Sequence, residues 1–337
     1  MTQTPITTPP PPEDATERLE NAIELKEVEG LSQGQIVFRR FVRHKGAMTA
    51  AAVLLLVILL ATTSIGIGPI DGWWQFDHIR THPTAIPGGR PTLQVGLDGI
   101  TIGAHPFGQD DIGRDLFARV MFGTQRSLLV MVLIGVLATT IGITFGALSG
   151  FFRGRVDTFL MRLTDMVITI PIIVVGAVLG KAFGGGNAVL LGLALGLVTW
   201  TTMSRLVRGD FLSLREREFV DAARVAGASN GRIMFKHMLP NAIGVIIVNT
   251  TLLMASAIIL ETSLSYLGFG VSAPDISLGQ LINDYQSAFA TRPWLFWWPG
   301  LFIIIIALCV NFIGDGLRDA FDPRQRKIPS KRKMRQG

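Results

Sequence analysis

The sequence predicts an all-α, polytopic membrane protein with six transmembrane helices. Hydrophobic residues make up 49% of its 337 residues and charged residues only 17%, and the mean hydropathy is +0.43. This balance differs from that of a soluble domain of the same size. Runs of residues without charge also recur along the chain, and about 20 apolar residues are enough for one helix to cross a bilayer.

Each predicted span is a run with few or no charges. Between 165 and 205 only Lys181 is charged, and Phe-Gly-Gly-Gly-Asn at 183–187 predicts a turn there, so this region is expected to hold two spans. The six predicted spans are therefore 46–70, 127–152, two within 165–205, 242–260 and 293–314.

The polar segments divide the chain into five parts. Residues 1–30 are rich in proline and threonine and predict a disordered tail, and 31–68 predict an interfacial helix followed by the first span. Residues 69–126 form a long loop on the other side. Spans two to six, with the polar loop 206–241, make up a core at 127–317, and 318–337 form a basic tail.

The distribution of basic residues predicts the orientation. An even number of spans places both termini on one side, and all but seven of the 31 Lys and Arg residues fall on that side. Because cytoplasmic segments are enriched in Lys and Arg, we expect both termini and the loop 206–241 to be cytoplasmic in a bacterial inner membrane. The seven outer residues are Arg80, Arg90, Arg114, Arg119, Arg126, Lys181 and Arg292.

The polar stretch 218–241 predicts a helix, a tight turn and a second helix at the membrane surface. Four apolar residues share one helical face: Phe219, Ala222, Ala223 and Ala226. Gly227 suits the left-handed residue that ends a helix, Ser229 suits an N-cap, and Pro240 is expected to close the second helix. The residues alone leave two interpretations open, a surface that a partner grips or a loop that lies on lipid.

Small residues inside the spans predict close helix packing. Gly142, Gly146 and Gly150 form one row and Gly192 with Gly196 another, which favours packing within the subunit or against a sister subunit. A separate feature is Pro171, which is expected to kink span three near its start, either as a structural bend or as a hinge.

No residue pattern predicts catalysis or metal binding. Gly176 with Gly180 and Lys181 is one residue short of a phosphate-binding loop, and Ala182 stands where Ser or Thr would hold magnesium. Cys309 is the only cysteine. His78 and His82 are four residues apart, but Pro83 opposes the helix that would align them, so no metal site is expected.

Glu261 follows an uncharged run at the predicted end of span five. A carboxylate facing lipid would be costly, so this side chain is expected either at the membrane interface or along a pathway through the protein. Glu261 and Pro171 are therefore the two candidate pathway or gate residues.

The polar stretch resembles the EAA loop of permease subunits in bacterial ATP-binding-cassette (ABC) importers. The resemblance rests on Asp-Ala-Ala at 221–223, a glycine at 227, Ile233, and Leu-Pro at 239–240, with Asp221 standing where the family usually has Glu. Three further blocks, at 105–123, 260–282 and 311–324, resemble the second membrane subunit of dipeptide and oligopeptide permeases. Gln125 and Arg126 depart from the family's usual Arg followed by an aliphatic residue.

The resemblance implies a type I importer permease fold with a cytoplasmic coupling loop. It implies a homologous permease, two ATPase subunits that bind ATP and magnesium, and an external peptide-binding protein as partners, with no cofactor and no enzymatic activity in this chain. The residues that would meet an ATPase are Glu218, Asp221, Ala222, Ala223, Gly227, Ile233, Leu239 and Pro240.

Two alternatives stay open at this stage. The same architecture could import nickel, glutathione or another small solute in place of a di- or oligopeptide. A secondary transporter is the rival from another class, although no inverted repeat or pair of intramembrane charges is evident in the sequence. In the outer loop, alternating residues around Asp98 and Gly99 predict a small hairpin, which is expected to contact the binding protein or the sister permease.

Overall fold

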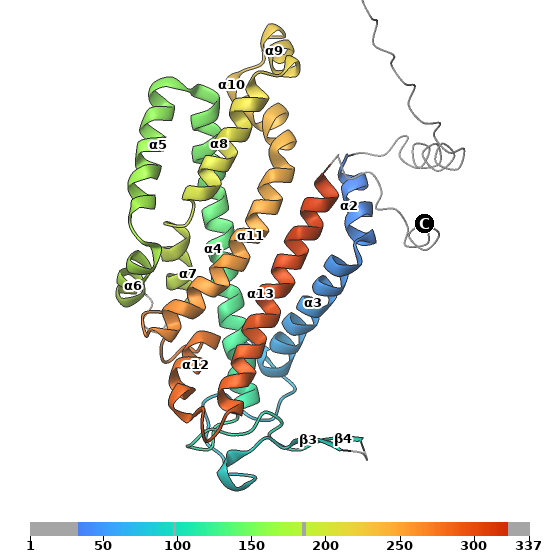
Figure 1. Ribbon diagram of the computed structural model, residues 1–337, viewed down its shortest axis with the longest axis vertical. Coiled ribbons are helices and arrows are strands. Elements are labelled where there is room, and N and C mark those ends of the chain that lie inside the picture. Colours follow the sequence, from blue (N-terminus) through green and yellow to red (C-terminus); the bar gives the residue numbers. More distant parts are fainter. Residues whose placement is uncertain (1–32, 97–98, 184–186, 323–337) are drawn as a thin grey trace, which may run out of the picture.

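The computed structural model describes residues 33–96, 99–183 and 187–322, and the predictions for the tail 1–30 and for most of the basic tail lie outside these residues. The described chain is an elongated bundle of helices (Figure 1). Helix α9 (Glu218–Val225) marks one end, and the strands β3 (Leu93–Gly96) and β4 (Gly99–Ile102) mark the other. We refer to them as the α9 end and the hairpin end.

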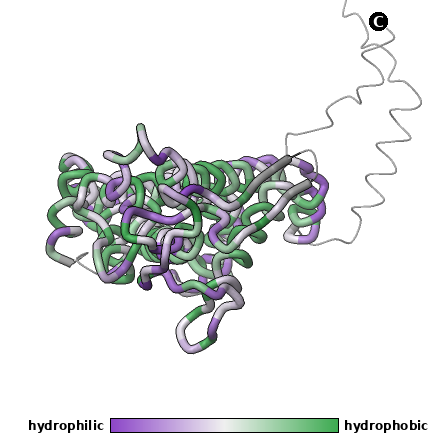
Figure 2. The backbone as a smooth tube through the Cα atoms, turned by 90° about the horizontal axis from the view of Figure 1, so that it is seen from below, coloured by the Kyte–Doolittle hydropathy of each residue, from purple (hydrophilic) through white to green (hydrophobic). Residues whose placement is uncertain are grey.

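Within the described residues, four helices are long and apolar enough to cross a membrane. They are α3 (Lys45–Ile65), α4 (Leu116–Phe152), α13 (Trp294–Phe321), and the continuous run Asn230–Tyr266 that contains α11 (Leu239–Tyr266). Two bent helix pairs bring the number of spans to six if each pair counts as one. Seen from the hairpin end, hydrophilic segments cross in front of hydrophobic helices (Figure 2).

The third and fourth predicted spans are broken helices. Helix α5 (Gly154–Thr169) meets α6 (Ile172–Phe183) at 82°, and α7 (Ala188–Gly196) meets α8 (Thr201–Arg215) at 41°. The predicted kink at Pro171 is confirmed, but it lies in the middle of the span because α5 begins at Gly154. Proline donates no backbone N–H and its ring pushes Ile170 into an extended conformation (φ −86°, ψ 125°), so the helix stops there.

Helix α4 begins well before the predicted start of span two at 127. Its N-terminus is capped by Asp115, whose Oδ2 accepts the Ala118 N–H at 2.8 Å. Arg119, which suggested loop, is 3% exposed inside the helix, and its guanidinium lies over the ring of Tyr285. A helix of this length is about 55 Å long, so it extends beyond an apolar layer of about 30 Å.

The first helices of the described chain are joined almost directly. Helix α2 (Gln33–Arg43) is followed by α3 after a single residue, His44, whose Nδ1 accepts the Ala47 N–H at 3.0 Å. Both helices pack against α13. The predicted interfacial helix before the first span therefore corresponds to α2.

The loop at the hairpin end contains two small antiparallel sheets. Strand β1 (Gly66–Ile67) pairs with β2 (Ile70–Asp71), so the first helix ends at Ile65 and not at 70 as predicted. Strands β3 and β4 pair in the register Leu93 with Ile102, which confirms the predicted hairpin; its tip, 97–98, lies outside the described residues. This end also contains the loop 267–277, helix α12 (Leu278–Tyr285), and 3-10 turns at Pro87–Gly89 and Gln286–Ala288.

A buried polar network fastens this loop to the bundle. Asp115 Oδ1 lies 2.7 Å from His105 Nδ1, and Asp115 Oδ2 also accepts the Trp74 indole N–H at 2.9 Å. Asp110 accepts the Tyr285 hydroxyl at 3.1 Å and the Arg114 Nε–H at 2.6 Å. Burial raises the pKa of the Tyr285 hydroxyl, so it remains a donor. The block 105–123 thus has a structural role.

The two glycine rows pack helices within this subunit. A Cβ atom added to Gly142, Gly146 or Gly150 would collide with α8, and one added to Gly192 or Gly196 would meet Leu133 or Leu137 of α4. The contacts agree with the packing interpretation: α4 lies directly against α8 on one side and α7 on another.

Replacing Gly146 with alanine is expected to destabilise the protein. The new Cβ would lie 2.5 Å from the Ser204 carbonyl oxygen and 2.7 Å from the Val207 Cβ, so α4 and α8 would have to separate. We expect the free energy of unfolding to fall by about 1–3 kcal/mol. Thermal unfolding of the detergent-purified protein measures this. Gly209→Ala on α8 is the control, because a Cβ there meets nothing within 4 Å; equal melting temperatures for the two variants would contradict the packing argument.

Candidate functional site

The segment at the α9 end forms the predicted helix, turn and helix. Helix α9 covers Glu218–Val225, and Gly227 has φ +78°, the left-handed conformation expected of it. Helix α10 (Asn230–Arg232) follows, with Ser229 at its N-cap. The prediction that Pro240 closes this second helix is wrong. A wide π-helical turn, η2 (Ile233–Met238), leads into α11, and Pro240 lies in the first turn of α11, where its missing N–H is tolerated.

The predicted apolar face of α9 is divided between the bundle and the surface. Val220 is fully buried and Ala223 is 9% exposed, and both pack in a cluster with residues of α4, α8 and η2. Phe219, Ala222 and Ala226 lie on the surface. The face of α9 that packs against the bundle contains Val220, whereas the sequence pattern placed the neighbouring Phe219 on that face.

The predicted contact residues therefore fall into two groups. Ile233 is fully buried and Leu239 packs against the same cluster as Ala223, so these three hold the segment on the bundle. The exposed group consists of Glu218, Asp221, Ala222, Gly227 and Pro240. Sequence reasoning missed Val225, whose side chain is 90% exposed on the same helix. An apolar side chain this exposed next to Ala222 and Ala226 is typical of a surface that another protein covers.

Charged side chains on this segment and just before it form ion pairs. Arg224 Nη1 lies 2.9 Å from Asp221 Oδ1, one helical turn away. Glu216, just before α9, pairs with Arg153 at the start of α5 at 2.5 Å. Both pairs are at least partly exposed, so they orient the segment more than they stabilise it.

Stronger contacts hold the helices beneath α9. Arg208 of α8 donates two hydrogen bonds to the Asp157 carboxylate of α5, at 2.6 and 2.7 Å, and the Ser149 hydroxyl of α4 donates to the same carboxylate. Arg215 donates to the Phe151 carbonyl oxygen at 2.8 Å. A two-point Arg–carboxylate contact fixes orientation as well as distance, so α4, α5 and α8 are joined at a defined angle.

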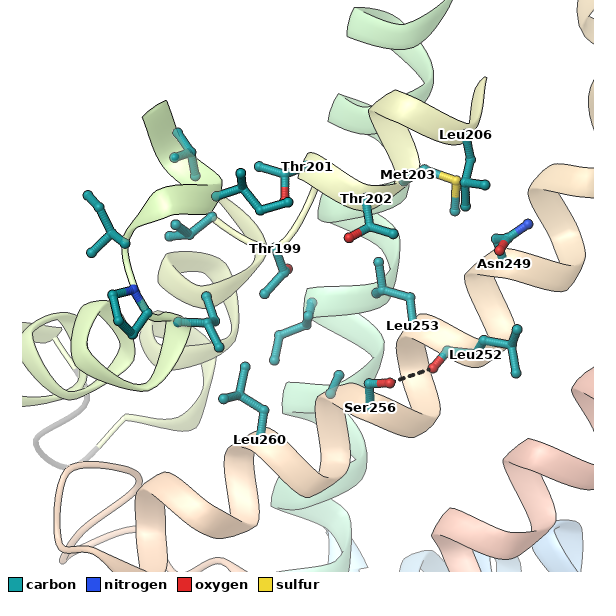
Figure 3. A pocket seen from close by; sticks show the side chains of 18 residues that line it. Thr199, Thr201, Thr202, Met203, Leu206, Asn249, Leu252, Leu253, Ser256 and Leu260 are labelled. Carbon is teal, nitrogen blue, oxygen red and sulfur yellow. Dashed lines mark hydrogen bonds between the residues drawn. The ribbon is translucent and has the colours of Figure 1, made fainter. Parts of the chain in front are cut away.

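A cavity of about 640 Å³ lies deeper in the bundle, between the two broken spans (Figure 3). Its walls come from α4, the α5–α6 break, the α7–α8 break and α11. Pro171 lines it, and Glu261 does not. The lining residues are Ile134, Val167, Ile168, Ile170, Pro171, Ile172, Val198, Thr199, Thr201, Thr202, Met203, Leu206, Asn249, Leu252, Leu253, Ser256, Ala257 and Leu260.

Polar atoms on the cavity wall are hydroxyl and amide groups. Ser256 Oγ donates to the Leu252 carbonyl oxygen at 3.0 Å, and Asn249 Nδ2 donates to the Val245 carbonyl oxygen at 2.7 Å. Thr199 donates in the same way to Leu195 at 3.0 Å. Each of these side chains donates a hydrogen bond to a carbonyl oxygen of the preceding turn. Its own oxygen can therefore accept a hydrogen bond from a group in the cavity. None of the described residues that line this cavity is charged.

Glu261 is enclosed by protein and is not among the residues that line the cavity. Its side chain is fully buried, and the hydroxyls of Ser127 and Ser265 donate to its carboxyl oxygens at 2.9 and 2.7 Å. These hydroxyls in turn accept the backbone N–H groups of Leu278 and Val271, each at 3.2 Å. Glu261 thus fastens the start of α12 and the preceding loop to α4 and α11. The sequence signal for this role was the recurrence of serine around 261–265.

His78 and His82 of the outer loop each pack against an aromatic ring. His78 stacks on Phe122, with ring centroids 3.9 Å apart, and pairs with Asp77 at 3.0 Å, while His82 packs against Phe76. Burial lowers the pKa of His78. Among the described residues no group of three His, Cys, Asp or Glu side chains could hold a metal ion.

Comparison with protein families gives two matches that together cover most of the chain. Residues 142–327 match the family described as binding-protein-dependent transport system inner membrane component. Residues 32–72 match the N-terminal transmembrane domain of oligopeptide transport permease C.

Individual relatives match over nearly their whole length. The oligopeptide transport system permease protein OppC of Escherichia coli K12 is 38% identical over 311 residues, which is 92% of this chain and 98% of the relative. OppC of Mycobacterium tuberculosis H37Rv is 37% identical over 298 residues, covering 88% and 97%. Among solved structures, an inward-facing form of the MetNI methionine ABC transporter aligns with a TM-score of 0.50 and 18% identity over 60% of this chain and 97% of that chain, a likeness of fold.

Removing the Glu261 carboxyl is expected to destabilise the hairpin end. Glu261→Leu leaves two buried serine hydroxyls without an acceptor, so the free energy of unfolding should fall by about 2 kcal/mol or more. Glu261→Gln, which keeps one oxygen, should lose less. Thermal unfolding in detergent gives the comparison. Ser265→Ala should also be destabilising, whereas the control Ser263→Ala removes a hydroxyl that donates to Ile259 of its own helix; similar losses from the two serine variants would refute the anchoring role.

Proposed function

We propose, because the chain belongs to the family of binding-protein-dependent transport system inner membrane components, that it is a permease subunit of an ATP-driven importer of di- or oligopeptides. The observation that carries the proposal is the match to two OppC proteins over about nine tenths of this chain and nearly their full length. The cavity between the broken spans is then this subunit's part of the translocation pathway, and the importer lies in the bacterial inner membrane.

The partners that this function needs are a homologous permease, two ATPase subunits and an extracytoplasmic peptide-binding protein. The exposed apolar surface of α9 supports a docked protein at that end, and the open cavity supports a second permease that completes the pathway. ATP and magnesium would be bound by the ATPases, and this chain would supply no catalytic group and no cofactor.

The proposed orientation places the α9 end in the cytoplasm, together with both termini. Basic residues support it: the segment 216–238 at the α9 end carries Arg217, Arg224, Arg232 and Lys236, whereas the longer loop 66–115 at the hairpin end carries only Arg80, Arg90 and Arg114. This is the asymmetry that membrane insertion favours.

The coupling surface consists of Glu218, Asp221, Ala222, Val225, Gly227 and Pro240. A movement of the ATPase would reach α9 at this surface, and from there the buried Val220 and Ala223 would pass it to α8 and η2. Helix α8 and α11, which continues η2, are both walls of the cavity. ATP binding by the ATPases would thus bias the bundle between outward-open and inward-open arrangements.

Peptide uptake by the complete complex tests this function. Vesicles would hold this chain, its sister permease and the two ATPases in their membrane. The binding protein and a labelled tripeptide would be added on the side that the proposed external face meets. We expect uptake only with ATP. Uptake of nickel or glutathione but not peptide would keep the architecture and change the cargo, and uptake by this chain alone on an ion gradient would overturn the proposal.

Gly227→Val is expected to uncouple ATP hydrolysis from uptake. A Cβ at this position meets nothing within 4 Å, so the penalty comes from the left-handed backbone alone, about 1 kcal/mol or more for a branched side chain. Uptake per ATP hydrolysed measures the effect. Gly227→Asn should be milder because asparagine tolerates this conformation, and Gly231→Ala is the control. Normal coupling in the valine variant would refute the role of the turn.

Shortening the β3–β4 hairpin is expected to weaken engagement of the binding protein or the sister permease. The hairpin projects from the hairpin end, and Ile102 is 69% exposed on it. Replacing 93–102 with a short Gly-Ser linker should leave the melting temperature unchanged, since the polar network around Asp115 lies outside the deletion, and reduce uptake or co-purification of a partner. Unchanged assembly and uptake would remove this role from the hairpin.

A further inference from the structure

We propose that the cavity recognises the peptide backbone of its cargo and is indifferent to the sign of the charge on cargo side chains, with Thr202, Asn249 and Ser256 as specificity-determining residues. This inference rests on the proposed peptide function. It concerns what this subunit selects once a peptide has been delivered, and it follows from the chemistry of the cavity wall.

The first observation is the absence of fixed charge along the described wall. Its polar side chains are threonine, serine and asparagine. Asp165 and Arg205 flank lining residues in sequence, but they pair with each other at 2.6 Å, so their charges offset each other. A cargo side chain with either sign of charge therefore meets no opposite charge that would favour it and no like charge that would repel it.

The second observation is the spacing of the acceptors on α11. Asn249 and Ser256 are seven residues apart, two turns of one helix face, which corresponds to about 10.5 Å. Three residues of extended peptide span about 10 Å. Each side chain has used a donor on its own helix, so an oxygen at each position can accept a backbone N–H of the cargo.

The third observation is that Thr202 lies on a different wall. It belongs to α8, and Figure 3 shows its hydroxyl directed into the space that separates α8 from α11. Thr202 and Ser256 are both exposed, and both line the cavity. An extended backbone has polar groups along both of its edges. Hydrogen-bonding side chains on two facing walls can therefore contact both edges of a peptide, whereas a single charged group could contact only one wall.

The volume agrees with a hydrated passage. A cavity of about 640 Å³ has the volume of roughly 20 water molecules in the liquid, which a short peptide and its hydration water would share. A charged cargo side chain can keep water around it there, whereas the backbone is met by the wall. Selection for side-chain charge, if the importer shows any, would then belong to another subunit.

Introducing a charge into the wall tests the inference. Three labelled tripeptides, Ala-Gln-Ala, Ala-Glu-Ala and Ala-Lys-Ala, would be delivered by saturating binding protein to the complete complex. Each rate is divided by the wild-type rate for that peptide, so selection by the binding protein cancels. Relative to the Gln peptide, we expect Thr202→Asp to raise the normalised rate of the Lys peptide about tenfold and to lower that of the Glu peptide about tenfold, as for unit charges about 6 Å apart at an effective dielectric constant of about 40. Thr202→Lys should do the reverse.

Control variants and a second experiment, in which the charge is added after assembly, distinguish a charge effect from misfolding. Thr158→Asp and Thr158→Lys, at an exposed position of α5 one turn after its start and outside the cavity, should leave the ratios unchanged. In a Cys309→Ala background, Ser256→Cys can be labelled after assembly with an anionic or a cationic methanethiosulfonate, which adds the charge to a folded complex. We expect the two labels to shift the Glu-to-Lys ratio in opposite directions.

The outcomes separate this inference from the proposed function. Opposite shifts with opposite charges, together with loss of all three peptides in Asn249→Leu, would support it. Equal effects on all peptides from both signs of charge would overturn it, as would wild-type vesicles that reject one charge when the binding protein does not. If wild-type vesicles import no peptide but import another solute with ATP, the proposed function fails and this inference fails with it.

Discussion

A backbone inside a bilayer has no water to satisfy its polar groups, and this constraint shapes the core of the structure. Two of the spans are nevertheless broken, one at Pro171 and one at 197–200. Irregular backbone at such depth is tolerated where it is enclosed by protein or borders a polar space. Both breaks border the same cavity, together with α4 and α11. The broken helices and the cavity are thus one feature, since each makes the other possible.

Helix α4 is the element around which the others are arranged. Its glycines allow α8 to lie against its backbone, its Gly135 meets Met254 of α11, and its N-terminal residues carry the network that holds the outer loop. Glycine contacts of this kind fix the distance between helices and leave little room for sliding. The α9 segment, resting on α8 and η2, is therefore linked to the cavity through packed side chains rather than through a flexible connection.

Charge and hydropathy predicted the class, the six spans and the polar stretch 218–241, because the cost of burying charge in lipid is large and local. The errors occur where tertiary contacts reverse a local preference. Arg119 was read as loop, but Tyr285 and Asp284 accommodate it inside α4. Pro240 was read as a helix end, but the π-helical turn before it lets the chain continue. The inner face of α9 follows Val220, and a period of 3.6 does not distinguish two faces that are both apolar.

Glu261 shows how contacts in the finished fold bear on how the chain enters the membrane. A helix that exposes such a carboxyl to lipid would be costly to insert, by roughly 2.5–3.5 kcal/mol near the centre of the bilayer. Ser265 is on the same helix, and Ser127 belongs to α4, which is synthesised more than a hundred residues earlier. When α11 leaves the ribosome, Ser127 of α4, which donates to Glu261 from outside α11, has already been synthesised. Co-translational insertion against α4 would spare this helix a stage alone in lipid, so the order of residues along the chain is itself part of how the protein assembles.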